Sequence, residues 1–266
     1  MRFAKVVLYD LKRGIYSCPC KLFGIGVVYF FILLDKANYL KALNITPSYY
    51  LFAVTFQGIS PYVPEDKLPF LFPAEWLIAV LPVLCYTLQY PVNDLSGFGK
   101  QILLRIADRK IWWYSKCIWL VSSLAVCSIL YTILLFIVSF GFRFSFSTDY
   151  TQVEEILNLI PLNPQNNIEI QMVCQVFFSL LALCFLQMFF SLMMGTTYSF
   201  TFLMVLLLLS TYFMKSYLPG NYLMLIRSAY YMENGIEFLP CLAVDFFIIA
   251  LSIWGGDRLI RQYNIF

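Results

Sequence analysis

Residues 89–119 read QYPVNDLSGFGKQILLRIADRKIWWYSKCIW, and they decide the fold because they form a compact basic stretch between two long apolar runs. The basic residues in this stretch are Lys100, Arg105, Arg109, Lys110 and Lys116. This charge predicts that the stretch lies outside a hydrocarbon layer. Short loops rich in Lys and Arg stay on the cytoplasmic side of a membrane and orient the neighbouring spans. The stretch therefore predicts the topology, and it also predicts a docking surface for a cytoplasmic partner.

The composition indicates an integral membrane protein. Of the 266 residues, 61% are hydrophobic, 19% are aromatic and 12% are charged, and the mean hydropathy is +0.76. Soluble domains have about 25% charged residues. One soluble core would lack polar surface, so a bilayer is the solvent that suits this chain. The length fits a single transmembrane domain over residues 1–266 and leaves no room for a separate catalytic domain of ordinary size.

Two absences from the sequence narrow the chemistry. The chain contains no His, which excludes His-based triads, most intramembrane metalloprotease sites and His proton relays. It also contains no GxxxxGK[ST] phosphate-binding loop, so ATP-driven work needs another polypeptide. We therefore expect that the chain is not an enzyme, binds no metal or cofactor by itself and has no nucleic-acid partner.

Six apolar segments predict an all-α membrane protein with six transmembrane helices. The segments cover residues 15–34, 73–91, 112–142, 170–194, 198–214 and 238–254. Only the turn at 195–197 separates the fourth segment from the fifth, which predicts an antiparallel hairpin. Trp112, Trp113 and Tyr114 predict an aromatic belt where the third span enters the headgroup layer.

The distribution of charge predicts the orientation. If the N-terminus lies inside, most of the 18 basic residues fall in the N-terminal segment, in the stretch 89–119 and in the C-terminal tail. Most of the acidic residues then fall in the outer connections. This bias predicts a multi-pass protein of the cell membrane with both termini in the cytoplasm. An even number of spans follows.

The first fourteen residues predict an amphipathic helix. Phe3, Val7 and Leu11 share one helical face, while Lys5 and Lys12 lie on the other. Such a basic amphipathic helix is expected to lie in the inner headgroup layer as an interfacial helix. The alternative is that the segment is only a positively charged flank of the first span.

The connection between the fifth and sixth spans combines helix breakers with an apolar stretch. Pro219, Gly220 and Asn221 end the helix, and the apolar sequence YLMLIRSAYYM follows. This pattern predicts a short re-entrant helical segment in the outer leaflet. Re-entrant backbone must be buried in protein or line a cavity, so the connection is a candidate cap over a pathway from outside.

Asp245 is the most informative single residue within the spans. It lies deep in the sixth apolar segment, where an acid costs about 2.5–3.5 kcal/mol on insertion scales. One explanation is that it pairs with a polar group on a neighbouring helix. The other is that it lines a cargo or proton pathway, which makes Asp245 the candidate pathway residue. Glu75 and Glu169 lie at the edges of spans and are weaker candidates.

These features together resemble the permease subunit of a type 2 ABC transporter. The stretch FGKQILLRIADRKIWWYSKCIW and the later SYLPGNYLMLIRS are similar to bacterial permeases of that family. The layout of spans, N-terminal helix and broken connection resembles the family over nearly the whole chain. The outer connection at residues 35–72 is long for the group and departs from it.

The resemblance implies a transport mechanism without covalent chemistry in this chain. Two permease subunits, identical or homologous, would pair within the membrane lipid and form the cargo pathway. Two cytoplasmic ABC ATPase subunits, which bind the ATP and Mg, would drive transport, usually export. The expected ATPase-docking residues are Asp94, Lys100, Arg105, Asp108, Arg109 and Lys110. The alternative for these residues is that they bind lipid phosphates and enforce orientation.

Two other classes of function compete with the permease. An ion-coupled secondary transporter or channel would use Asp245 and Glu169, but the sequence shows no internal inverted repeat and no second broken helix. A membrane-embedded transferase is disfavoured further, because the sequence lacks His and any clustered carboxylate motif at a membrane edge.

Overall fold

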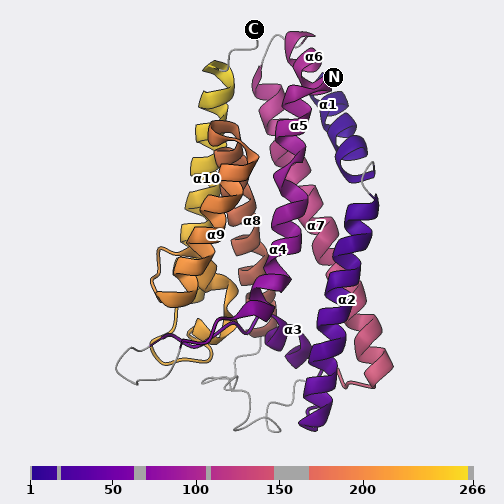
Figure 1. Ribbon diagram of the computed structural model, residues 1–266, viewed down its shortest axis with the longest axis vertical. Helices are drawn as coiled ribbons and strands as arrows, with labels where there is room; N and C mark the ends of the chain where they lie inside the picture. Colours follow the sequence, from indigo (N-terminus) through magenta and orange to yellow (C-terminus); the bar gives the residue numbers. More distant parts are fainter. Residues whose placement is uncertain (1, 17–18, 63–69, 106–108, 147–167, 263–266) are drawn as a thin grey trace.

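The computed structural model describes residues 2–16, 19–62, 70–105, 109–146 and 168–262, and these ranges are helical without a β-strand (Figure 1). A single-turn π-helix, η1 (Lys12–Tyr16), follows the first α-helix, and two 3-10 turns, η4 (Pro219–Leu223) and η5 (Leu225–Arg227), precede the last one. The α-helices are α1 (Arg2–Leu11), α2 (Pro19–Ala42), α3 (Tyr49–Thr55), α4 (Ala74–Leu88), α5 (Tyr90–Ser96), α6 (Phe98–Arg105), α7 (Arg109–Phe142), α8 (Ile168–Met194), α9 (Thr196–Tyr212) and α10 (Phe238–Gln262).

Four helical stretches in the described chain are long and apolar enough to cross a membrane. They are α4 with α5, α7, α8 and α10. A fifth arises if the N-terminal helix and α2, which are bent by 56°, count as one span. Helix α9 has 17 residues, about 25 Å of helix, which is shorter than a hydrocarbon core of about 30 Å. The chain is thus all-helical and suited to a membrane, and six crossings would require both the bent pair and α9 to span.

The observed helices extend beyond several of the predicted segments. Helix α7 begins at Arg109, α10 continues to Gln262, and α2 starts at Pro19 and ends at Ala42, well past the predicted end of the first span. Lys36 on α2 forms an ion pair with Glu75 on α4, so charged residues are accommodated in the last turns of α2. Hydropathy alone ends a span at the first charges, whereas the helix continues where a neighbour supplies a partner.

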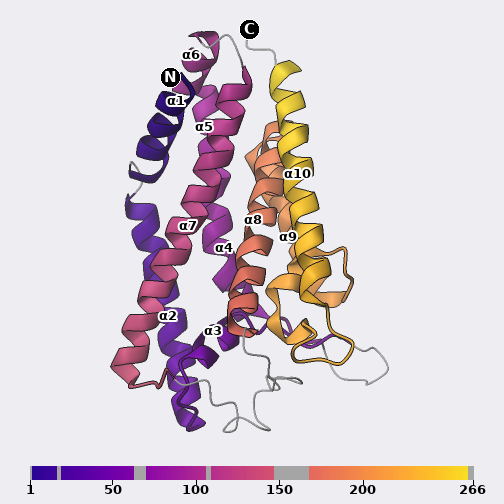
Figure 2. The same cartoon turned by 180° about the vertical axis from the view of Figure 1, so that it is seen from behind.

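The long helices run side by side along the longest axis (Figures 1 and 2). We call the end with α1, α5, α6 and the last turn of α10 the terminal end, and the end with α3, η4 and η5 the loop end (Figure 1). Helix α7 packs against α1 and α2, and α8 packs against α9 and α10. The first and last described helices therefore reach the same end of the bundle.

The expected aromatic belt is wrong for two of its three residues. Trp112 and Trp113 are fully buried, and only Tyr114 is exposed. The indole N–H of Trp113 donates to the carbonyl oxygen of Ile253 on α10 at 2.8 Å. The start of α7 is covered by α5, α6 and α10, so these tryptophans pack inside the bundle and do not face the headgroups.

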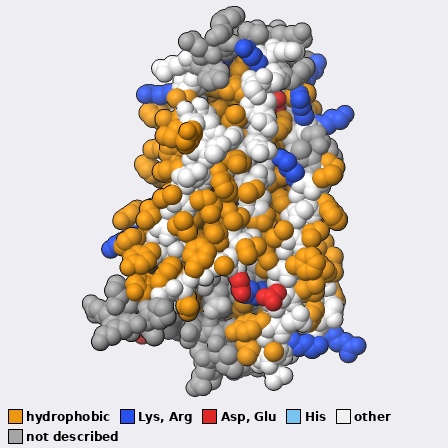
Figure 3. All heavy atoms as spheres, in the orientation of Figure 1, with side chains coloured by type: hydrophobic (Ala, Val, Ile, Leu, Met, Phe, Trp, Pro, Cys, Tyr) orange, Lys and Arg blue, Asp and Glu red, His pale blue; other side chains and the backbone are white. Residues whose placement is uncertain are grey.

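The exterior between the two ends is apolar. Hydrophobic side chains cover the middle of the face in Figure 3, and Lys and Arg side chains gather near the two ends. On α10, the side chains of Leu239, Phe247 and Trp254 are all exposed. A continuous apolar exterior of this kind is unfavourable in water and suits lipid or another membrane subunit.

Candidate functional site

Lys116 on α7 is fully buried, and its ammonium group lies between two carboxylates at the terminal end. Its Nζ is 2.5 Å from Oδ1 of Asp10 on α1 and 2.7 Å from Oδ2 of Asp94 on α5. We call Asp10, Asp94 and Lys116 the ion cluster. One ammonium group thus joins three helices that are distant in the sequence.

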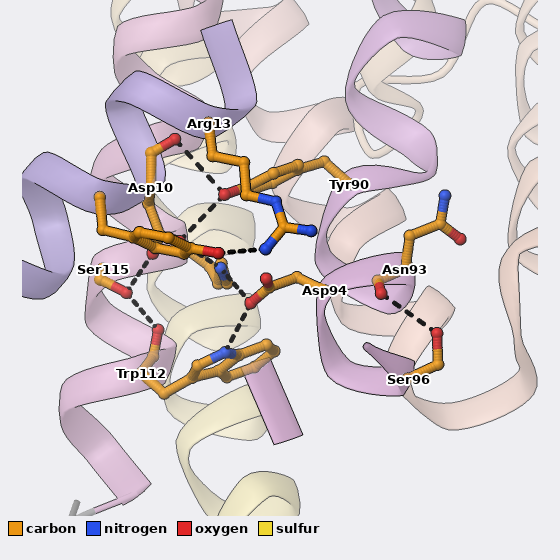
Figure 4. A network of polar contacts seen from close by, with 10 residues as sticks. Asp10, Arg13, Tyr90, Asn93, Asp94, Ser96, Trp112 and Ser115 are labelled. Carbon is orange, nitrogen blue, oxygen red and sulfur yellow. Dashed lines mark hydrogen bonds and ion pairs between the residues drawn. The ribbon is translucent and has the colours of Figure 1, made fainter. Parts of the chain in front are cut away.

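Uncharged donors also contact both carboxylates (Figure 4). Ser115 Oγ donates to Asp10 Oδ2 at 2.6 Å, and the Tyr90 hydroxyl donates to Asp10 Oδ1 at 3.0 Å. Trp112 Nε1 donates to Asp94 Oδ2 at 3.0 Å. The rings of Tyr90 and Trp112 also lie 4.7 and 5.1 Å from the Lys116 ammonium, a distance at which a cation is attracted to an aromatic face.

The spacing of residues on α7 explains how the site forms. Trp112, Ser115, Lys116 and Trp119 recur at the three- and four-residue steps that place side chains on one helical face, and all four are buried. The N-terminal helix meets this face closely at Gly14, where an added Cβ would lie 2.0 Å from Trp119 Nε1. The helix therefore packs against α7 through Asp10 and Gly14, which are its buried residues, rather than through an apolar stripe alone.

The ion cluster places two carboxylates around one ammonium group in an enclosed site, and this makes its three members depend on each other. Removing one partner of a buried ion pair costs about 3–5 kcal/mol, because the other charge is left buried and uncompensated. Separation of any one of α1, α5 and α7 from the other two would leave a buried charge without its partner. The three helices are consequently held together at the terminal end by charge as well as by packing.

The predicted docking residues differ in their exposure. Lys100 on α6 is exposed, whereas Arg109 and Lys110 at the start of α7 are half-buried. The Arg109 guanidinium donates to the carbonyl oxygen of Arg261 on α10 at 3.0 Å. Arg105 is the last residue of α6, and Asp108 lies outside the described residues.

Asp94 and Lys116 are buried beneath the predicted docking residues of α6 and the start of α7. Lys116 was expected in an exposed basic stretch, and the structure instead buries it completely. Asp94 is buried as well, so it belongs to the ion cluster and not to an exposed charged surface. Helix α6 touches the cluster directly, since an added Cβ at Gly99 would lie 2.2 Å from Asp94 Oδ2. Helix α6, whose Lys100 is exposed, and the buried cluster are therefore in contact.

Asp245 points into the bundle and not toward lipid. It is fully buried on α10, and Ser179 Oγ on α8 donates to its Oδ2 at 2.7 Å. The thiol of Cys241, one turn earlier, lies 3.7 Å from the same oxygen. Within the described residues, Asp245 Oδ1 has no hydrogen-bond partner. The structure thus brings Asp245 to a polar group on a neighbouring helix, and it does not bring it to Glu169.

The connection between α9 and α10 forms a cap at the loop end. Pro219, Gly220 and Asn221 lie in η4 and are buried, and the apolar residues after them pack into the bundle. Arg227 at the end of η5 is also fully buried. Where a single short re-entrant helix was expected, the described backbone forms two separate 3-10 turns.

Arg227 holds the cap to two other segments. Its Nε donates to the carbonyl oxygen of Ile59 at 2.9 Å, and its Nη2 donates to that of Thr211 at 2.7 Å. Its Nη1 donates to the carbonyl oxygen of Ser210 and to the side-chain oxygen of Asn221. Burial lowers the pKa of Arg227 to about 10, which leaves the guanidinium charged at neutral pH. The cap is therefore organised by one buried cation and its acceptors.

Comparison with known families identifies the chain. The profile of the family described as "Protein of unknown function (DUF2705)" matches residues 26–256. The chain belongs to the DUF2705 family. Searches of curated proteins and of solved structures found no match. The DUF2705 match includes Asp94, Lys116 and Asp245, whereas α1 and its Asp10 precede it.

Sequence reasoning missed the parts of this DUF2705 chain that depend on contacts between distant segments. Asp10 was not singled out, although it is the only acidic residue among the first 34. An isolated carboxylate in a basic helix is a signal that a cationic partner lies elsewhere in the fold. Arg227 was not singled out either, although it stands within an apolar run. Within the described ranges, no three Cys, Asp or Glu side chains are grouped so that they could hold a metal ion.

Proposed function

We propose that the chain is the membrane-spanning permease subunit of an ATP-driven ABC transporter, an exporter of the bacterial cell membrane. The resemblance of its span layout, its stretch 98–119 and its broken connection to type 2 permeases supports this assignment. The observation that carries it is the contact between helix α6, with its exposed Lys100, and the buried ion cluster. That contact links a surface accessible to a cytoplasmic partner with three helices of the bundle.

In the proposed mechanism the ATPase docks on α6 and on the start of α7, where Lys100, Arg105 and Arg109 supply the positive charge. ATP and Mg bind to the ATPase, and this chain performs no covalent step. Movement of α6 is passed through Asp94 and Lys116 to α1 and α7. Because α7 extends over 34 residues to the loop end, a shift at its start changes the arrangement of the bundle there. Such a transition between two packed states alternates the affinity for cargo.

The same proposal assigns the membrane topology. The terminal end faces the cytoplasm, the bent N-terminal pair and α9 both cross the membrane, and a second permease subunit pairs with this one. The cap of η4 and η5 covers the outer side of the pathway. In a cysteine-free background, cysteines placed at Lys100 and Arg261 should be labelled only from the cytoplasm, and one at Lys41 only from outside. Labelling of position 100 from outside would overturn this orientation.

The docking role is tested by purification of the chain after co-expression with the ABC ATPases of the same host. The double variant Lys100→Glu with Arg105→Glu should lose the ATPase, because it reverses the charge of the docking surface. The matched control, Lys41→Glu with Lys215→Glu, changes the same charge at exposed positions of the loop end and should retain it. Normal recovery of the ATPase with the docking variant refutes the docking surface, and no recovery with the unmodified chain refutes the permease assignment.

One observation favours a second candidate, an ion-coupled transporter. Asp245 is buried with one oxygen held by Ser179 and the other without a partner among the described residues, as in a site that takes up a proton. In proteoliposomes without ATPase, this candidate predicts transport driven by a proton gradient and its loss in Asp245→Asn. Transport that requires ATP and survives Asp245→Asn removes this candidate.

A further inference from the structure

A cavity of about 510 Å³ lies between α2, α3, α4, α7 and α8 in the half of the bundle nearest the loop end. Small-molecule sites in proteins have volumes of roughly 300–1,000 Å³ and are mostly apolar with a few polar groups. The size of this cavity therefore suits a drug-sized molecule. Asp245 does not line it.

Aromatic rings form the inner wall of the cavity. Tyr131 is at the centre of a cluster in which its ring centroid lies 5.2 Å from that of Tyr29, 6.2 Å from Phe52 and 5.7 Å from Phe56. The four rings come from α2, α3, α7 and the residue after α3, and all four line the cavity. Aromatic faces attract organic cations within about 6 Å, so this wall favours a ligand that is both apolar and positively charged.

Glu169 is the only charged side chain among the described residues that line the cavity. Its Oε1 is buried and has no hydrogen-bond partner within the described part of the chain. No Lys or Arg lines the cavity there, and the sequence between residues 147 and 167 contains none either. A carboxylate oxygen withdrawn from water beside an apolar cavity, without a basic partner from these residues, is complementary to a cation.

Helices α7 and α8, which both line the cavity, diverge toward the loop end (Figure 2). The lining residues Phe136 on α7, Phe146 after it and Val173 on α8 are all exposed. An apolar rim of this kind admits a molecule from the hydrocarbon layer. Because Glu169 is in the first turn of α8, a bound amphiphile would have its charge near the loop end and its apolar body deeper.

We propose that this cavity binds a lipophilic organic cation, with the cationic group at Glu169 and the apolar body against the Tyr131 ring cluster. Binding is a property of this chain alone and needs neither ATP nor a partner. The identification of such cations as cargo rests in addition on the proposed permease function. The binding site and the transport role can therefore fail separately.

Two ions of nearly the same shape and opposite charge provide the test. Tetraphenylphosphonium is a cation and tetraphenylborate is an anion, and both are apolar. Their affinities for the purified chain in a neutral detergent are measured by calorimetry, with protein-free micelles as the reference. We expect the chain to bind tetraphenylphosphonium at least tenfold more tightly. Equal affinities, or no binding of the cation above the micelle reference, overturn the proposal.

Variants then assign the preference to the cavity. Glu169→Gln should weaken tetraphenylphosphonium binding about tenfold, which corresponds to about 1.4 kcal/mol, and should leave tetraphenylborate unchanged. Glu75→Gln is the matched control, because Glu75 is an exposed carboxylate on α4 away from the cavity, and it should change neither affinity. Cys174→Phe, which fills the cavity from α8 while keeping Glu169, should weaken both ions. A Glu169→Gln protein that keeps the cation preference, or a Cys174→Phe protein that keeps both affinities, overturns the proposal.

Further measurements distinguish a folding defect from a loss of binding, and the binding site from the transport role. Each variant is compared with the unmodified chain by thermal unfolding, and Glu169→Asp, which retains the charge, should restore most of the preference if Glu169→Gln folds poorly. Selective cation binding without recovery of an ATPase would leave the site standing and remove the transport role. Recovery of the ATPase without selective cation binding would leave the permease function standing and remove the cation site.

Discussion

Replacing Lys116 by Met is the sharpest test of the ion cluster. Met keeps nearly the length and apolar volume of the Lys side chain and removes only the ammonium group. The variant leaves the carboxylates of Asp10 and Asp94 buried near each other without the cation that lies 2.5 and 2.7 Å from them. The site would then have two like charges and three neutral donors, from Ser115, Tyr90 and Trp112.

The expected magnitude follows from the burial of the three groups. Breaking a buried ion pair on one side costs about 3–5 kcal/mol, and here a single substitution breaks two contacts. We therefore expect the free energy of unfolding to fall by at least about 3 kcal/mol. Replacing all three residues, with Asp10→Asn, Asp94→Asn and Lys116→Met together, should recover a large part of this loss, since no buried charge is then left uncompensated.

The assay is denaturant unfolding of the purified chain in detergent, followed by tryptophan fluorescence. Trp112 and Trp119 lie next to the cluster, so their emission should shift to longer wavelength in Lys116→Met as this end loosens. Lys100→Met is the control, because Lys100 is an exposed lysine at the same end. Surface substitutions usually change stability by no more than about 0.5 kcal/mol. If Lys116→Met is as stable as Lys100→Met, the ion cluster does not hold α1, α5 and α7 together.

Three further variants test other parts of the structure. Gly14→Ala should destabilise the chain by about 1–3 kcal/mol through overpacking, because the added Cβ meets Trp119. Gly24→Ala is the control and should not destabilise it, since nothing lies within 4 Å of the added Cβ; equal unfolding midpoints of the two variants would contradict the packing of the N-terminal helix on α7. Arg227→Gln should loosen the cap and speed tryptic cleavage at Lys215 at least severalfold, as charged hydrogen bonds contribute about 1.5–3 kcal/mol each; unchanged cleavage would show that Arg227 does not hold the cap. Asp245→Leu, which removes the buried carboxylate, should be at least as stable to unfolding as Ser179→Ala, which leaves that carboxylate without its donor. If Asp245→Leu transports in proteoliposomes at the unmodified rate, Asp245 is not part of the pathway.

The long helices were largely predictable because hydropathy is a local property of the chain. The segments 170–194 and 112–142 differ from α8 and α7 by three residues or fewer at either end. The tight turn between α8 and α9 was expected because only residues 195–197 separate the two apolar segments. The first span was predicted less well, since α2 continues to Ala42 past charged residues, one of which, Lys36, pairs with Glu75 on another helix. Local composition contains no information about that partner.

The candidate site was predictable from the sequence only for those charged residues that are exposed in the fold. Lys100 is exposed as expected, but Lys116, sixteen residues later, is the buried centre of a cluster. The sequence shows that both are basic, and their burial depends on acidic residues brought near by folding, one of which is 106 positions away. Glu169 was considered a weak candidate because an acid at the edge of a span is inexpensive. Its significance comes from the cavity beside it, which exists only in the packed structure.

The separation of Asp10 and Lys116 along the chain has a consequence for biogenesis. Asp10 leaves the ribosome long before its cation, and at 5–20 residues per second the separation of 106 positions corresponds to about 5–20 s of synthesis. During that interval its carboxylate has no ammonium partner and must stay in contact with water or headgroups. We therefore expect the N-terminal helix to dock only after α7 has been made. Its docking onto α7 is then a late step of assembly, and a truncated nascent chain that ends before Lys116 should leave Asp10 accessible to solvent.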